Sequence, residues 1–192
     1  MAVLSDVSIL EAVETGRLGI SPFDGECVEP CSVDLRLGNS FHVFRECEDE
    51  IDVKSLPEDL VDIIDVADGE AFTLRPGAFV LAPTQETVTL SGDLMAILDG
   101  KSSLGRLGIH VHATAGVVDA GFSGRLTLEL SNVTPRPVKL YPGMRIAQIV
   151  LFDLSTLAAR PYGTASLGSK YQGASDVMES RYGDNFVDGE PI

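Results

Sequence analysis

Hydrophobic and polar residues alternate with a period of two through much of the chain, in short runs separated by glycine and proline. The alternation is clear at residues 32–37 and 40–44, and later runs are bounded by turn sequences such as 75–77 and 142–143. The later strand-like runs are 71–74, 79–83, 87–90, 94–98, 109–114, 125–132, 138–141 and 146–153. Many short strands with this punctuation, without a helical period between them, predict an all-β sandwich, jelly roll or distorted barrel.

One helix is predicted ahead of the strands, at residues 5–15 within an N-terminal segment 1–18. Ser5 or Asp6 provides an N-cap for this helix, and Gly16 ends it. Its apolar face is expected from Ile9, Leu10 and Val13.

Two segments depart from the strand pattern. The acidic segment 46–68 fits either a short helix at 58–64 or a mobile loop, and the sequence leaves both open. The tail 160–192 is rich in Gly, Ser, Tyr and Asp, as in a frayed end. Its hydroxyl groups and its lysine also fit a lid that folds over phosphates. The 192 residues fit a single domain, 1–192, with this tail as its last part.

The net charge of −15, from 29 acids and 14 bases, restricts the partners of the protein. Such a surface disfavours nucleic acid as a general partner and suits a halophilic, high-salt cytoplasm. An anionic ligand would therefore need a local cluster of bases. The N-terminus carries acids and no apolar core run, and the apolar runs are too short to cross a bilayer, so we expect a cytoplasmic protein without membrane contact.

The candidate chemistry is concentrated between residues 99 and 129. Residues 100–106 form a small-residue turn with two hydroxyls, a lysine and an arginine, suited to phosphate oxygens but lacking the Walker A spacing. An ordinary strand connection is the alternative. Glu129 alternates with leucines, so it either faces solvent or lines a cleft as a general base. Asp119 follows two β-branched residues at the end of a strand.

Cysteine and histidine give only weak metal signals. The three cysteines are an odd number, which disfavours a disulfide framework, and Cys27 and Cys31 lack a second matching pair of ligands. His110 and His112 share one strand face without an apparent third ligand, and the H-x-E and P-C-x-x-C signature of zinc deaminases is absent. We therefore expect these residues to be structural or to lie on the surface.

Together these segments resemble the dCTP deaminase and dUTPase superfamily, and the deaminase form most closely. The matching motifs, in order, are SVDLRLG (32–38), GKSSLGRLG (100–108), TAGVVDAGFSG (114–124), GMRIAQIVLF (143–152) and RPYGTASLGSKYQG (160–173). The resemblance implies a distorted jelly-roll β-barrel of the dUTPase type. It also implies homotrimers with active sites at subunit interfaces, and a deaminase without zinc.

The resemblance also assigns roles by position. Glu129 would be the general base that activates water for attack on cytosine C4, and Asp119 would meet the deoxyribose 3′-hydroxyl. Water and the intermediate would be held by Ser102, Arg106 and the backbone at Ala115. Triphosphate, with Mg²⁺, would be bound by Lys101, Ser103, Tyr162, Lys170 and Gln172. The matched segments also place Thr127 and Gln148 among the substrate-binding residues.

Two product patterns are compatible with this resemblance. Some members release dUTP and ammonia, whereas others also hydrolyse the triphosphate to give dUMP and pyrophosphate. Gly116 stands where deaminase-only members often carry histidine, and Gln148 and the GSKYQG tail resemble the two-activity form. We therefore expect the dUMP-forming reaction from dCTP, with dUTP as intermediate or second substrate. The alternatives are a deaminase that stops at dUTP, a dUTPase alone and a non-catalytic nucleotide-binding trimer.

Overall fold

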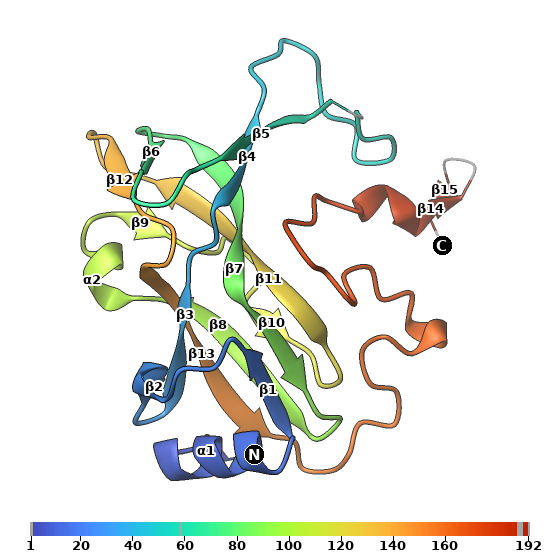
Figure 1. The fold of residues 1–192 in the computed structure, drawn as a ribbon. Helices are drawn as coiled ribbons and strands as arrows, with labels where there is room; N and C mark the ends of the chain where they lie inside the picture. Colours follow the sequence, from blue (N-terminus) through green and yellow to red (C-terminus); the bar gives the residue numbers. More distant parts are fainter. Residues whose placement is uncertain (1, 58, 188–189, 192) are drawn as a thin grey trace.

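Two antiparallel sheets face one another across a single core in the computed structural model, which describes residues 2–57, 59–187 and 190–191 (Figure 1). The first sheet contains, in order across it, β5 (Val61–Asp65), β4 (Ser40–Phe44), β7 (Phe79–Leu90), β11 (Ser123–Asn132) and β9 (Ile109–His110); β1 (Leu18–Ser21) also pairs with β7. The second contains β10 (Val117–Val118), β8 (Leu94–Gly100), β13 (Arg145–Asp153), β3 (Ser32–Arg36) and β2 (Val28–Glu29). The all-β prediction is confirmed.

Smaller elements complete the described fold. A ribbon of β6 (Phe72–Leu74) and β12 (Val138–Leu140) lies at one end of the molecule (Figure 1). The remaining elements are α1 (Asp6–Glu14), α2 (Ser102–Gly105), the 3₁₀ turns η1 (Gly25–Cys27), η2 (Ala165–Leu167) and η3 (Tyr182–Asn185), and the pair β14 (Phe186–Val187) and β15 (Glu190–Pro191). Among the described residues, no helix is both long and apolar enough to span a bilayer.

The alternation within β11 separates the core from the opposite face of the strand. Leu126, Leu128 and Leu130 are buried and belong to the core, as expected from a period of two. The residues between them are only half-buried and point the other way. Strand β11 therefore contributes both to the core and to a polar face.

Strand β7 is continuous, although the sequence pattern predicts two separate strands at 79–83 and 87–90. Pro83 interrupts the pattern because it has no N–H to donate. The neighbouring Thr84 is fully buried, and its hydroxyl accepts the Leu126 N–H at 3.1 Å and donates to the Glu86 carbonyl at 2.8 Å. The hydroxyl lies where the β7–β11 register shifts, and thus joins the two halves of the strand.

Helix α1 confirms the predicted N-terminal helix but corrects its buried face. The Ser5 hydroxyl accepts the Ser8 N–H, and Gly16 follows the helix with a φ of +74°. Ile9 and Ala12 are buried, whereas Leu10 is 43% exposed. An i, i+3 pair lies on one side of a helix, and Leu10 lies outside that stripe.

Two other predictions need correction. Residues 61–65 of the acidic segment form β5, paired with β4, so neither the helix at 58–64 nor a mobile loop describes this part; residue 58 lies outside the described residues. The strand expected at 109–114 ends at His110. Residues 111–116 instead form a loop, whose amides bind a side chain of β11.

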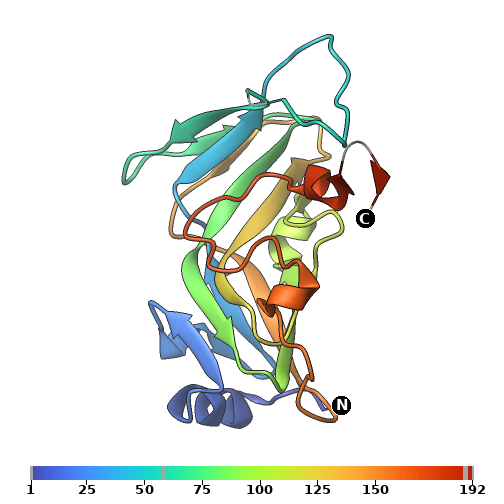
Figure 2. The same cartoon turned by 90° about the vertical axis from the view of Figure 1, so that its right-hand side faces the viewer.

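The C-terminal tail is not a frayed end. It runs beside β11 and β10 (Figure 2), and Ala174 and Val177 in it are buried. The Arg125 N–H donates to the Ala174 carbonyl, and the Gly173 N–H donates to the Ser123 carbonyl, both at 2.7 Å. These backbone bonds attach the tail to the start of β11.

A buried ion pair joins the two sheets. The carboxylate of Glu86 on β7 is 2% exposed and accepts the Arg36 Nε–H at 2.6 Å and the Arg36 backbone N–H at 2.8 Å. The hydrogen bond to Glu86 raises the pKa of the Arg36 guanidinium, so this side chain remains charged.

We predict that Glu86→Ala will lower the free energy of unfolding by about 3 kcal/mol, because it leaves the Arg36 charge and amide unpaired at a mostly buried position. Urea unfolding of the intact protein measures this loss. Asp62→Ala, which breaks the exposed Arg45–Asp62 pair, is the control and should change stability little. Equal losses in both variants would contradict a special contribution from the buried pair.

Candidate functional site

Two adjoining cavities lie between the β11–β10 region and the C-terminal tail. The larger has a volume of about 580 Å³ and the smaller about 540 Å³. Both are within the range of small-molecule sites. The residues that line both cavities are Val117, Asp119, Tyr162 and Tyr171. The cavities therefore meet at these four residues.

Glu129 lines the larger cavity, on the polar face of β11 with Thr127 and Arg125. Its Oε2 atom accepts two backbone N–H groups, from Ala113 at 2.6 Å and from Thr114 at 3.1 Å. These bonds fix one carboxylate oxygen, while Oε1 makes no hydrogen bond with the described residues. An oriented carboxylate in a partly enclosed cavity is suited to accept a proton from water.

The opposite wall of the larger cavity is apolar and was missed by sequence reasoning. It comes from β4, β7 and the acidic segment, and its residues include Phe44, Ile51, Val53, Leu56, Leu60 and Phe79. The sequence does contain isolated apolar residues among the acids of 46–60. These residues have no regular spacing, so they did not indicate a shared surface.

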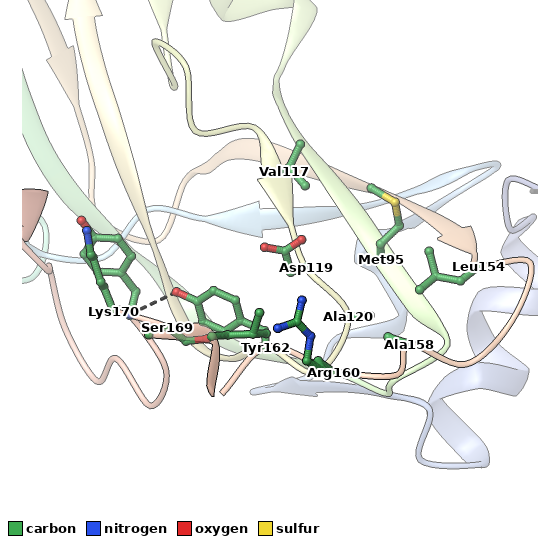
Figure 3. A pocket seen from close by; sticks show the side chains of 13 residues that line it. Met95, Val117, Asp119, Ala120, Leu154, Ala158, Arg160, Tyr162, Ser169 and Lys170 are labelled. Atoms are coloured by element: carbon green, nitrogen blue, oxygen red, sulfur yellow. Dashed lines mark hydrogen bonds between the residues drawn. The ribbon is translucent and has the colours of Figure 1, made fainter. Parts of the chain in front are cut away.

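Asp119 lies at the junction of the two cavities, directly after β10, with an exposed side chain. Tyr162 faces it across the junction (Figure 3). Three contacts hold Tyr162 in place: its N–H donates to the Ala120 carbonyl at 2.8 Å, its hydroxyl accepts the Tyr171 N–H at 3.1 Å, and its ring packs against Phe122. Asp119 and Tyr162 therefore lie at the same junction.

Gln172 and Lys170 lie in the tail but are engaged within the chain. Gln172 accepts the Ser123 N–H at 3.1 Å and donates to the Gly121 carbonyl at 3.0 Å. Lys170 lines the smaller cavity, and its ammonium donates to Asn185 at 2.6 Å. Gln172 thus attaches the tail to the barrel, and Lys170 has an internal partner beside the smaller cavity.

The remaining predicted site residues form a second group that lines neither of these two cavities: Lys101, Ser102, Ser103, Arg106 and Gln148. Figure 1 shows α2 at one edge of the molecule and the C-terminal tail at the other, with strands of both sheets between them. One chain therefore does not bring Ser102 and Arg106 to Glu129.

Lys101 is part of a charge cluster on β3. Its ammonium lies 2.5 Å from the buried Asp34 carboxylate, and Arg145 lies 3.7 Å from the same carboxylate. Gln148 is nearby and donates to the Gly100 carbonyl at 3.4 Å. The pair with Asp34 orients Lys101 toward the sheet, and its side chain remains 24% exposed.

The turn after Lys101 is the single helical turn α2. The Leu104 and Gly105 N–H groups both donate to the Lys101 carbonyl at 3.0 Å, so these amides are used within the turn. The hydroxyl-bearing Ser102 and Ser103 remain exposed. The groups that this turn presents are therefore mainly side chains.

The described residues contain no group of three or more His, Cys, Asp or Glu able to hold a metal ion. Burial raises the pKa of the Cys27 thiol, which lies in the core cluster and serves as a packing residue. Cys31 is an exposed free cysteine.

Comparison with known proteins identifies the family of this chain. The family model described as dCTP deaminase-like matches residues 3–154. The chain belongs to this family. It is 50% identical over 186 residues to "dCTP deaminase, dUMP-forming" of Mycolicibacterium vanbaalenii, covering 96% of this chain and 98% of that one. The protein of the same name from Corynebacterium glutamicum is 49% identical over 185 residues, with the same coverage.

A solved structure supports the fold as well. The crystal structure of 2′-deoxycytidine 5′-triphosphate deaminase from Agrobacterium tumefaciens is 27% identical, with a TM-score of 0.61 over 78% of this chain. This chain covers 46% of the length of that structure, so it spans about half of it. The predicted jelly-roll barrel of this superfamily is confirmed.

In this member of the dCTP deaminase-like family, the tail closes the larger cavity through two polar contacts. The Thr127 hydroxyl accepts the Met178 N–H at 3.1 Å. The Glu179 carboxylate, which also lines the cavity, lies 3.1 Å from Nδ1 of the buried His42 on β4. The tail is therefore attached to both β11 and β4 around Glu129.

We predict that Thr127→Val will increase the hydrogen-exchange rate of the Met178 amide about fivefold, because it removes the only acceptor that the described structure gives this amide. Exchange measured by mass spectrometry on tail peptides tests this. Thr73→Val, an exposed position on β6, is the matched control. Unchanged protection of Met178 would show that the hydroxyl does not hold the tail.

Proposed function

We propose that the protein deaminates dCTP and then hydrolyses the triphosphate, giving dUMP, ammonia and pyrophosphate and so supplying dUMP for thymidylate synthesis. The observation that carries this proposal is the Glu129 carboxylate, held by two amides at the wall of a nucleotide-sized cavity. Family membership and relatives named "dCTP deaminase, dUMP-forming" support the same reaction.

In the deamination step, Glu129 takes a proton from water as the oxygen attacks C4 of cytosine. The new C4–O bond forms a tetrahedral intermediate. Proton transfer from Glu129 to the amino group then allows the C4–N bond to break and releases ammonia. The proton of the C4 hydroxyl moves to N3, which leaves the uracil carbonyl. The two amides that bind Oε2 keep Oε1 directed for both transfers, so one carboxylate acts first as base and then as acid.

In the second step, another water attacks the α-phosphate and pyrophosphate leaves. Gly116 would leave space for this water, because it is part of the loop 111–116 and carries no side chain. A β-carbon there would lie 3.4 Å from the Leu98 carbonyl and 3.6 Å from His112, so a larger residue would fill the gap. Asp119, which lines both cavities, would orient the second water.

We propose that the complete site forms between subunits of a homotrimer. The two groups of predicted site residues lie at opposite edges of one chain, as expected for a head-to-tail ring in which each site takes one group from each neighbour. In this arrangement α2 of one copy, with Ser102 and Arg106, meets Glu129 of the next. Exposed apolar residues on the outer face of the second sheet, Ile97 and Val117, fit such a contact.

Magnesium is proposed to enter with the substrate. Mg²⁺ prefers phosphate oxygens and water, supplemented by one or two carboxylates. The substrate phosphates would hold the ion, and no residue of this chain is proposed as its direct ligand. Bound Mg²⁺ would neutralise phosphate charge that the few bases of this chain leave unbalanced.

We predict that purified protein with dCTP and Mg²⁺ will release ammonia and pyrophosphate in equal amounts, with dUMP and little free dUTP. Phosphorus NMR together with an ammonia assay measures these products. Ammonia with accumulating dUTP would restrict the protein to deamination. Binding of dCTP without either product would indicate a non-catalytic nucleotide-binding protein.

We further predict that Glu129→Gln will reduce deamination at least about 100-fold while dCTP affinity stays within a few-fold, because the amide keeps the shape but cannot take the proton. Arg106→Ala should also be nearly inactive. Co-refolding equal amounts of the two variants should restore about a quarter of wild-type activity if each site combines Glu129 and Arg106 from different subunits. If the co-refolded mixture stays inactive while co-refolded wild type is active, a site shared between subunits is contradicted.

A further inference from the structure

Arg160 lines the smaller cavity, although neither the sequence motifs nor the proposed reaction gives this residue a role. It lies two residues before Tyr162 in the tail, and Figure 3 shows its guanidinium directed into the cavity on the side of Asp119. The apolar part of the wall comes from Met95, Leu154 and Ala158. The cavity therefore combines an apolar wall with a few charged groups, as in many ligand sites.

The Arg160 guanidinium makes no hydrogen bond or ion pair with any residue that the structure describes. Several other arginines of this chain, which has 29 acids and 14 bases, do have a carboxylate partner. Arg17 pairs with Asp93 and Asp153, for example, and Arg181 pairs with Asp184. An arginine directed into a cavity without a carboxylate partner is suited to an anionic ligand.

The order of groups along the two cavities indicates which part of the nucleotide reaches Arg160. Glu129 lines only the larger cavity, Asp119 lies where the cavities meet, and Arg160 lines only the smaller cavity. If cytosine lies at Glu129 and deoxyribose at Asp119, as the proposed function requires, the phosphates continue into the smaller cavity. We infer that Arg160 binds the terminal phosphates of the nucleotide, and therefore the pyrophosphate product. This inference rests on the proposed function.

The chemistry of the cavity is consistent with this assignment. Guanidinium donates two parallel N–H groups to a phosphate and keeps its charge at all relevant pH values. Lys170, which lines the same cavity, adds a second positive charge at its edge. Asp119 is the acid that faces these groups, and Mg²⁺ carried by the phosphates would offset its repulsion.

Binding of inorganic pyrophosphate tests the assignment without requiring turnover. Isothermal titration calorimetry of the intact protein with Mg²⁺ and pyrophosphate should give an affinity at least about tenfold weaker in Arg160→Ala, the loss expected for a charged hydrogen bond. Arg160→Lys should recover part of it. Arg136→Ala is the matched control, because this substitution removes the same charge at an exposed residue that lines neither cavity.

Three outcomes would overturn the inference: no measurable pyrophosphate binding by the wild type, equal affinity in Arg160→Ala and wild type, or equal losses in Arg160→Ala and Arg136→Ala. The last would mean that overall charge, not contact, controls binding. Thermal unfolding of each variant confirms that the fold is retained. Wild-type turnover of dCTP is measured separately, so pyrophosphate binding at Arg160 without turnover would reject the proposed reaction and leave the anion site in place.

Discussion

The register of β11 against β7 determines both the core and the candidate site. The leucines of β11 complete the core, and this burial fixes which way every other residue of the strand points. A slip of one residue would place Glu129 in the core and a leucine in the cavity. The Thr84 hydroxyl maintains the pairing where Pro83 cannot donate a hydrogen bond. The position of the carboxylate is therefore a consequence of hydrophobic burial on the other side of its own strand.

Much of the fold could be predicted, because a half-buried strand leaves a local pattern that can be read directly. The strand at 125–132, its inward leucines and the helix capped near Ser5 are examples. Predictions failed where the determining contact is remote in sequence. Strand β5 forms because it pairs with β4, and nothing within the acidic segment indicates that partner. The loop after His110 departs from the strand pattern to bind the Glu129 carboxylate, which lies about twenty residues further on.

The candidate site was only partly accessible to sequence reasoning. Motif resemblance identified the residue types, and the structure places Ala115, Asp119, Thr127, Glu129 and Tyr162 around the larger cavity. Resemblance alone did not reveal that Lys101 is paired with Asp34, since that contact joins two strands distant in sequence. It also gave no role to Arg160, the first residue of a tail without periodicity. The residues around α2 and those around Glu129 lie apart within one chain, so the proposed reaction depends on assembly of the homotrimer.

Unpaired arginine at a cavity of a strongly acidic protein also affects how an anion arrives. At a distance, a nucleotide meets the repulsion of a net charge of −15. Attraction begins only within a few ångströms of the few exposed bases. Salt screens the long-range repulsion, over about 8 Å at physiological ionic strength, more strongly than it weakens close and partly enclosed contacts. Capture of a triphosphate should therefore become faster as salt is added, the reverse of the behaviour of enzymes that steer their substrates by opposite charge.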